Sequence, residues 1–389
     1  MDNHILFDYN RDELLPFTYT RPVSEIRVGI LTIREHYELL LDAQVSYVTE
    51  KYLSEKFPNW IEEENLYFNG AVLPTPAIID AAKNLKLGQS LFQKGIPLAS
   101  FTGKKFDLQS SDRLEYKGTV NVIERPWDIF TLNEVAIKDQ FRLITHGKKT
   151  IPLSHTNKVL GKGNVFVEEG ARVECAMINA ENGPVYIGKN TEIMMGAMIR
   201  GPFALCEGAT VKMGAKIYGA TTIGPYSKVG GEVSNSVIFG YTNKGHDGFL
   251  GNSVLGEWCN LGADTNNSNL KNNYSSVKVW DYLSTKMIDS KLQFCGLFMG
   301  DHSKSSINSM FNTGTIVGVN TNIFGHGFPP KVVNSFSWGG IDSNERFSLE
   351  KAIQLAKEVY NRRNKDFDHV EEHILRDVFN MTESTDQNS

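Results

Sequence analysis

Cysteine is scarce in this sequence, and so are basic runs and long apolar runs. The four cysteines lie far apart, so none has the short spacing of a zinc site, and we expect reduced, buried thiols. No apolar run is long enough to span a membrane, and the first ten residues lack a basic-then-apolar leader. With a net charge of -5 and no lysine or arginine run, the chain is not expected to bind nucleic acid. We therefore expect a soluble, cytoplasmic protein with neither a membrane nor a nucleic-acid partner.

An aliphatic residue recurs at every sixth position in the middle of the chain. The members are Ile187, Ile193, Ile199, Leu205, Val211, Ile217, Ile223 and Val229. A helix repeats at 3.6 residues and a strand at 2.0, so neither explains this period. A hexapeptide repeat explains it, because each six residues form one short parallel strand and a corner, and three faces close one coil. The sequence predicts a parallel β-helix over residues 151–335 with this column buried at its axis.

The period breaks after Val229 and resumes at Leu255 and Leu261. This break predicts that residues 231–251 form a loop projecting from the coil, with His246 at its tip. A histidine there is a candidate general base near neutral pH. The alternative interpretation is an exposed imidazole on a flexible excursion.

The two ends of the chain show other patterns. Residues 1–150 alternate short apolar strands, at 5–8, 45–49 and 66–68, with helical stretches at 29–41 and 76–85. This order predicts an α/β domain with a parallel sheet and ligands at the carboxyl ends of its strands. Residues 336–389 predict two helices, which we expect to pack on the β-helix and seal its open end.

The loop that follows the first predicted strand contains Arg11, Arg21 and Arg27 and the step Leu15–Pro16. Here the chain resembles the N-terminal domain of the sugar-phosphate nucleotidyltransferases. That family cradles a triphosphate in a glycine-rich loop, whereas this chain has no glycine before Gly29. The resemblance implies that the three arginines bind the nucleotide phosphates instead. The alternative is that they are surface or ion-paired arginines.

Asn69 stands where the same family has an aspartate that holds Mg²⁺. An asparagine offers a carbonyl oxygen without charge, so Mg²⁺ would bind more weakly or elsewhere. Asn69 is the fourth candidate for the nucleotide site.

A second resemblance begins near His246. It is carried by Glu232, Val233, His246, Phe249, Leu250, Gly251, Gly256, Asn260, Leu261, Gly262, Ala263, Thr265 and Asn269. This pattern is similar to the acetyltransferase half of the bifunctional N-acetylglucosamine-1-phosphate uridylyltransferase and glucosamine-1-phosphate acetyltransferase, the GlmU-like family. That family has a left-handed β-helix, so we expect a nucleotidyltransferase-like domain, a left-handed β-helix and C-terminal helices.

The resemblance implies roles for individual residues. His246 would be the general base, and Asn260 and Asn269 would orient the sugar and its amine. The backbone at Ala263 would lie against coenzyme A and offer an amide to the developing oxyanion.

Charged residues complete the implied site. The family's sugar-phosphate lysine and tyrosine are Ser234 and Phe249 here, and Lys244 stands one residue closer to the histidine than the family's lysine does. Lys244 is a candidate for sugar binding, and Lys271 or Lys278 is the candidate to restore the lost charge. His302 and Lys304 are candidates for binding the coenzyme A phosphates. Their alternative role is a hydrogen-bond network at a corner of the coil.

The resemblance implies an enzyme in UDP-N-acetylglucosamine synthesis. It would transfer acetyl from acetyl-coenzyme A to glucosamine-1-phosphate and then transfer uridylyl from UTP with Mg²⁺, as a homotrimer. The alternative is a sugar-nucleotide-binding or scaffold protein with an inactive first domain. A zinc site of three histidines, as in β-helical γ-class carbonic anhydrases, is disfavoured because no two histidines have the required five-residue spacing.

Overall fold

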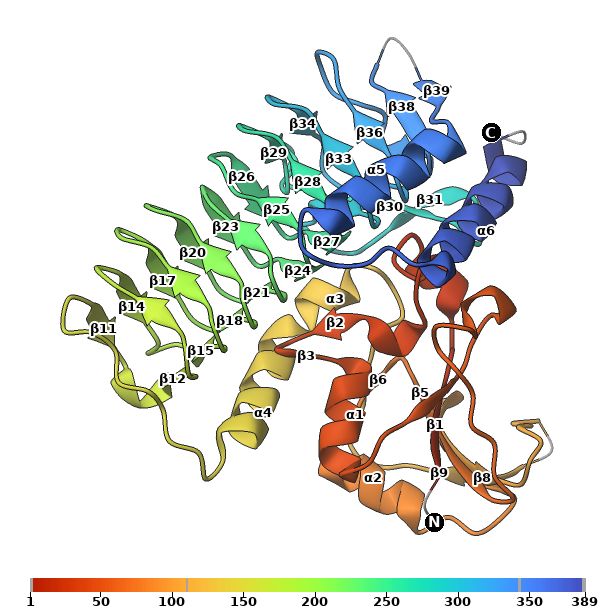
Figure 1. The fold of residues 1–389 in the computed structure, drawn as a ribbon. Helices are drawn as coiled ribbons and strands as arrows, with labels where there is room; N and C mark the ends of the chain where they lie inside the picture. The colour runs from red at the N-terminus through yellow and green to blue at the C-terminus, as the bar shows by residue number, and fades with distance from the viewer. Residues whose placement is uncertain (1–2, 110, 342–343, 387–389) are drawn as a thin grey trace.

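The computed structural model describes residues 3–109, 111–341 and 344–386. Figure 1 shows an α/β part beside a long solenoid, with two C-terminal helices near the late coils of the solenoid and the α/β part. No helix among these residues is both long and apolar enough to cross a bilayer. Cys206, Cys259 and Cys295 are buried, as expected, whereas Cys175 is exposed.

The α/β part is built on one mixed sheet. Its strand order is β4 (Ser46–Val48), β1 (His4–Phe7), β5 (Asn65–Asn69), β8 (Ile96–Thr102), β7 (Gln89–Gln93) and β9 (Asp112–Glu115). The three predicted strands are β1, β4 and β5, and they pair in parallel as expected. The sheet departs from the prediction at β8, which is antiparallel to both β5 and β7, whereas β9 pairs in parallel with β7. The reversal follows from a two-residue turn at Lys94 and Gly95, which both have positive φ.

The α/β part also contains helices and short strands outside this sheet. They are the 3₁₀ turns η1 (Arg11–Leu14), η2 (Val23–Glu25) and η3 (Lys51–Leu53), the strands β2 (Arg27–Val28), β3 (Leu31–Thr32), β6 (Val72–Leu73) and β10 (Asn121–Val122), and the helices α1 (Ile33–Leu41), α2 (Pro76–Lys83), α3 (Asp128–Thr131) and α4 (Asn133–Thr145). Helix α1 begins later than predicted, because residues 27–32 form the β2–β3 hairpin and Thr32 caps α1 in a capping box with Glu35.

The predicted β-helix is present and has three faces of stacked parallel strands. Face 1 contains β11 (Lys158–Leu160), β14 (Met177–Asn179), β17 (Met198–Arg200), β20 (Lys216–Tyr218), β23 (Glu232–Ser234) and β26 (Phe249–Gly251). Face 2 contains β12 (Val165–Val167), β15 (Val185–Ile187), β18 (Phe203–Leu205), β21 (Thr221–Ile223), β24 (Val237–Gly240), β27 (Val254–Glu257), β32 (Leu297–Met299), β35 (Thr315–Val317) and β37 (Val332–Val333). Face 3 contains β13 (Arg172–Val173), β16 (Glu192–Ile193), β19 (Thr210–Val211), β22 (Lys228–Val229), β25 (Asn243–Lys244), β28 (Asn260–Leu261), β33 (Lys304–Ser305), β36 (Asn322–Ile323) and β38 (Ser337–Gly339). The additional strand β39 (Asn344–Arg346) pairs with β38 in the antiparallel sense. The turn η4 (Lys162–Asn164) leads into β12.

The six-residue column forms the axis of the solenoid. All eight members are at most 3% exposed and belong to one apolar cluster. Successive members lie on face 2, face 3 and face 1 in turn, which is why the period is six. Each buried aliphatic side chain contributes about 1.5–3 kcal/mol before conformational entropy is counted.

The prediction of an inserted loop at residues 231–251 is wrong. This segment continues the coil as β23 to β26, and Ile223 pairs with Ile238 across face 2. The period breaks because the inward residues Val229, Val233 and Ile238 are spaced by fewer than six residues. The main excursion from the later coils is the hairpin of β30 (Lys278–Asp281) and β31 (Lys286–Asp289), which follows β29 (Asn266–Asn267). Strand β34 (Met310–Phe311) pairs with β29 above face 1.

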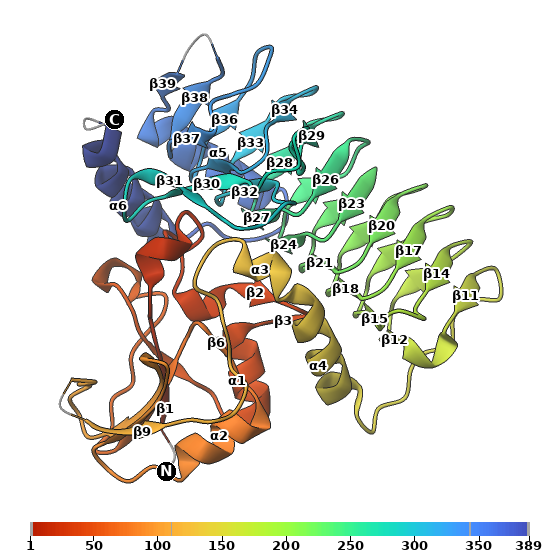
Figure 2. The same cartoon turned by 180° about the vertical axis from the view of Figure 1, so that it is seen from behind.

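The α/β part covers face 2 of the solenoid. One apolar cluster joins Trp127 and residues of the mixed sheet to Phe239 and Phe298. This cluster places Trp127 in the domain interface. Helix α4 lies along the early coils, where Ile137 packs with Tyr186. The β30–β31 hairpin reaches the same domain through a 2.7 Å ion pair between Asp281 and Arg125 (Figure 2).

The C-terminal helices, α5 (Leu349–Asn361) and α6 (His369–Asp386), connect the solenoid to the α/β part. Their apolar faces pack on Phe336 of the solenoid and Leu53 of η3. Lys56 forms a 2.6 Å ion pair with Glu371. The prediction that these helices pack on the β-helix is confirmed. The prediction that they seal its open end is wrong, because they also pack on the α/β part and the last solenoid strand, β38, pairs with β39.

Candidate active site

The corner between faces 3 and 1 brings the predicted base next to the predicted coenzyme A residue. His246 is exposed at the turn that joins β25 to β26. Ala263 occupies the same corner one coil later, because Asp264 N–H donates to the Asp247 carbonyl over 3.0 Å. Sequence spacing alone does not show this stacking, since seventeen residues separate the two positions.

Backbone groups at this corner suit acyl transfer. The Ala263 carbonyl accepts from Asn308 N–H over 2.8 Å. The Ala263 N–H has no hydrogen-bond partner among the described residues, so it remains available to an incoming oxygen. Asn260 lies on β28 directly above Asn243, whose amide donates to its side-chain oxygen over 3.0 Å.

Asparagines line the far end of β26. Asn266 accepts from Phe249 N–H over 2.7 Å, and Asn267 accepts from Gly251 N–H over 2.9 Å. Asn269 donates to the Asn252 side chain over 2.8 Å and is half-buried. Phe249 begins β26 next to the His246 turn, whereas Asn269 stacks on Asn252 just beyond the other end of β26. The buried Asn267 was not singled out from the sequence, although it occupies an inward position that is usually aliphatic.

The structure contradicts a sugar-binding role for Lys244. This lysine is 2% exposed and pairs with Val229 in the inward column. Its Nζ donates to the His246 carbonyl over 2.7 Å, so it anchors the turn that carries the base. Burial lowers the pKa of Lys244 to about 8, against the opposing effect of the nearby Asp247 and Asp264 carboxylates.

Lys271 remains near the candidate site. It follows Asn269 and is half-buried, and its Nζ donates to the Ser276 carbonyl over 2.6 Å. This bond holds the base of the β30–β31 hairpin. A sugar phosphate would have to share Lys271 with that carbonyl.

The predicted coenzyme A role of His302 and Lys304 is also contradicted. Both belong to the opposite corner, between faces 2 and 3, and His302 is only 4% exposed. Burial holds the pKa of His302 well below its usual value, helped by the positive charge of Lys304. Lys304 Nζ donates to the His302 carbonyl over 2.7 Å, which fits the alternative of a hydrogen-bonded corner. Burial lowers the pKa of Lys304 to about 8.

An aromatic column explains why His302 is covered. Tyr226, Tyr241 and Trp258 occupy successive turns of this corner, and their rings stack at centroid distances of 5.2 and 4.2 Å. Tyr360 of α5 then stacks on Trp258 at 3.9 Å and on His302 at 6.0 Å. The sequence does not reveal this column, because Tyr360 is remote and the other spacings are irregular.

The three arginines of the predicted nucleotide site form hydrogen bonds or ion pairs with other protein groups. Arg11 donates to the Asp8 carboxylate over 3.3 Å and to the Tyr52 hydroxyl over 2.5 Å. Arg21 is 6% exposed and forms an ion pair with Asp301 of the solenoid. Arg27 is 7% exposed and donates to the Phe239 carbonyl over 3.2 Å. The alternative of ion-paired arginines therefore fits the structure, and the predicted phosphate role does not.

Asn69 does not fit Mg²⁺. It is fully buried, its amide donates to the Pro97 carbonyl over 2.7 Å, and its oxygen accepts from Ala71 N–H over 2.8 Å. The neighbouring Asp8 carboxylate accepts from Val23 N–H over 2.7 Å. Across the described residues there is no cluster of three or more His, Cys, Asp or Glu arranged to hold a metal.

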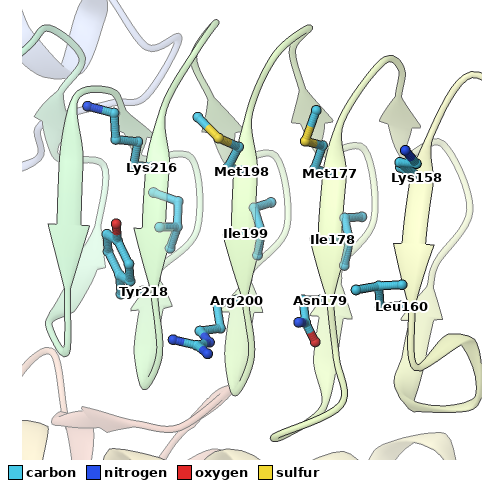
Figure 3. Close-up of a pocket in the computed structure, with 11 residues that line it drawn as sticks. Lys158, Leu160, Met177, Ile178, Asn179, Met198, Ile199, Arg200, Lys216 and Tyr218 are labelled. Carbon is cyan, nitrogen blue, oxygen red and sulfur yellow. The ribbon is translucent and has the colours of Figure 1, made fainter.

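Face 1 has a shallow hollow over its early coils, formed by β11, β14, β17 and β20. Its volume is about 590 Å³, and Figure 3 shows Met177 and Met198 side by side on neighbouring strands. Their exposed fractions are 57% and 41%. The hollow lies on face 1, whereas the α/β part covers face 2.

Comparisons with known proteins match both parts of the chain. Residues 4–149 match the family of sugar nucleotidyl transferases. A bifunctional GlmU protein from Methanocaldococcus jannaschii is 31% identical over 207 residues, covering 53% of this chain and 44% of the relative. A GlmU protein from Methanococcus maripaludis is 25% identical over 325 residues, covering 82% of this chain and 69% of the relative.

The chain spans about half the length of the first of these relatives. Among solved structures, a hexapeptide transferase family protein from Anaplasma phagocytophilum covers 51% of this chain and 94% of its own, with 19% sequence identity and a TM-score of 0.25.

Proposed function

Since the chain is a divergent relative of the GlmU-like bifunctional transferases, we propose that it transfers an acetyl group from acetyl-coenzyme A to the amine of a sugar phosphate. The observation that carries this proposal is the stacked corner, where the exposed imidazole of His246 lies one coil from the free amide of Ala263. Glucosamine-1-phosphate is the proposed acceptor, in a route to UDP-N-acetylglucosamine.

The proposed chemistry uses groups at this corner. The sugar amine attacks the thioester carbonyl, and His246 takes the proton that the amine loses. The Ala263 N–H stabilises the oxyanion while the carbon–sulfur bond breaks, and the coenzyme A thiolate leaves and is protonated. Asn269 orients the sugar at the other end of β26. General-base catalysis of this kind contributes about 10²–10⁴-fold in rate.

We also propose a homotrimer in which face 1 lies against a neighbouring protomer. The exposed methionines and the hollow of Figure 3 support this, because an uncovered apolar patch of a solenoid favours burial. A neighbour at face 1 would close the open side of the His246 corner. Sedimentation equilibrium tests the trimer, and Met198→Lys should convert it to monomers.

The second proposed activity is uridylyl transfer from UTP to the acetylated sugar phosphate, supported by the family match over residues 4–149. Asn69 and the three arginines do not supply its site, so no step is assigned to them. Acetyl-coenzyme A and UTP are cytoplasmic metabolites, which is why we expect the enzyme in the cytoplasm.

One assay tests both activities. Purified protein is given acetyl-coenzyme A, glucosamine-1-phosphate, UTP and Mg²⁺, and free thiol and pyrophosphate are followed separately. His246→Ala should lower thiol release by about 10²-fold or more. The matched control is His155→Ala, since His155 is an exposed histidine at the start of the same solenoid. Unchanged thiol release in His246→Ala, with the circular dichroism spectrum intact, would remove the proposed base.

A further inference from the structure

A polar cavity of about 270 Å³ lies where the α/β part, the solenoid and the C-terminal helices meet. Its charged lining comes from all three parts and comprises Arg21, Glu25, Arg27, Arg34, Glu35, Lys56, Glu257, Asp301 and Glu371. His302 and Tyr360 also line it. The cavity belongs to the corner between faces 2 and 3, whereas His246 lies at the corner between faces 3 and 1. The acetyl-transfer chemistry therefore leaves this cavity unused.

Two groups on its wall lack hydrogen-bond partners. Arg21 Nε and His302 Nδ1 are buried and unpaired among the described residues. Both side chains are more than nine-tenths buried. An unpaired buried polar atom costs about 1–3 kcal/mol, so such atoms indicate a missing partner. Because arginine only donates, the missing partner of Arg21 must present an acceptor oxygen.

The charges on the wall argue against an anionic occupant. The lining has four arginine or lysine side chains and five carboxylates, so one negative charge is in excess while His302 is neutral. Each cation is already paired: Arg21 with Asp301, Arg27 with Glu35, Arg34 with Glu25, and Lys56 with Glu371. A phosphate would have to displace these carboxylates and then face them. A hydroxyl group avoids this conflict, since it accepts from a guanidinium and donates to a carboxylate.

We propose that this cavity binds an uncharged monosaccharide. Several hydroxyl groups on one small ring can satisfy Arg21 and still donate to Glu257 and Glu35, whose side chains are 33% and 34% exposed. A volume of about 270 Å³ lies just below the range of pockets for drug-sized ligands, so it suits one sugar ring rather than a nucleotide. Because three parts of the chain form the wall, the bound sugar holds the two domains and the C-terminal helices together. This site stands apart from the proposed acetyl acceptor.

Calorimetric titration of the full chain tests the proposal. The probes are glucose, galactose, mannose and N-acetylglucosamine, with inorganic phosphate and glucose-1-phosphate as charged competitors. At least one neutral sugar should bind more tightly than either phosphate. Glu257→Gln should weaken that binding about tenfold or more, because it removes one hydrogen bond to a charged group. Arg21 keeps its Asp301 partner in this variant, so the fold should be retained.

Two further variants locate the binding. Glu63→Gln changes a carboxylate that is 83% exposed and does not line the cavity, so its sugar affinity should equal that of the wild type. His246→Ala should also bind the sugar normally. Loss of binding in His246→Ala would place the sugar at the acetyl-transfer corner and overturn this inference while leaving the proposed function standing. Failure of all four sugars to bind, tighter binding of phosphate, or an unchanged affinity in Glu257→Gln would also overturn it.

Discussion

Replacing the buried lysine of the solenoid core should make the protein more stable and its proposed chemistry slower. Lys244 occupies an inward position next to Val229, and burial lowers its pKa from 10.5 to about 8. A shift of this size corresponds to roughly 3 kcal/mol against the charged amine in the folded state. Lys244→Met removes this cost and restores an apolar side chain to the column, but it loses the bond to the His246 carbonyl, worth about 1 kcal/mol. The variant should therefore be about 1–3 kcal/mol more stable at pH 7.

The advantage of Lys244→Met should depend on pH in a defined direction. Below pH 8 the amine is charged in both states, and the full cost is present in the wild type. Between about pH 8 and 10.5 the folded lysine has lost its proton while the unfolded lysine still binds one, so the wild type gains stability relative to the variant. Urea denaturation at pH 7, 8, 9 and 10, followed by circular dichroism, measures this difference. Lys189→Met, which changes an exposed lysine of the solenoid outside the hollow of face 1, is the matched control.

A difference between wild type and Lys244→Met that stays constant from pH 7 to 10 would refute this reasoning. The same variant connects stability to the proposed chemistry. Without the bond from Nζ, the turn that carries His246 loses an anchor, so kcat for acetyl transfer should fall while KM for acetyl-coenzyme A changes little. An unchanged kcat would show that Lys244 does not position the base.

Three more substitutions test other parts of the structure. Gly248→Ala should destabilise the protein by a few kcal/mol in thermal melts, because φ is +119° and the added methyl would overlap a backbone carbonyl oxygen. Gly88→Ala is the control: φ is +87°, but the added methyl meets open space, so this variant should lose less stability. Asp301→Asn leaves Arg21 with weaker pairing at the domain interface and should cost up to about 3–5 kcal/mol, seen as a lower urea midpoint. Tyr360→Ala removes one ring of the aromatic column, so limited proteolysis should cut the C-terminal helices sooner than in the wild type.

The solenoid was predictable from the sequence because its signal is strictly local. Every sixth residue from Ile187 to Val229 is buried at the same axis, so the period can be recognised in the sequence without knowledge of distant contacts. The prediction failed at residues 231–251, where the inward spacing shortens while the coil continues. Shorter steps within a coil look like an insertion in the sequence, and only strand pairing distinguishes the two.

The candidate site was predictable as a set of residues but not as an arrangement. His246 and Ala263 meet because consecutive coils stack. The same stacking places Lys244 inside the column and His302 at another corner. The expected sugar-binding role of Lys244 and coenzyme A-binding role of His302 are therefore both wrong. Residue type indicated possible ligands, and the direction of each side chain decided whether a ligand could reach it.

The sequence by itself determined the elements whose causes lie within a few residues: the aliphatic hexads, the first three strands of the α/β sheet and the C-terminal amphipathic helices. Tertiary structure decided which partners the charged and aromatic residues contact. Arg21 forms an ion pair with Asp301 across the domain interface. Tyr360 stacks on Trp258, although more than a hundred residues separate them in the sequence. A charge or ring far from its partner in sequence carries no local pattern, because its free energy depends on what folding brings beside it.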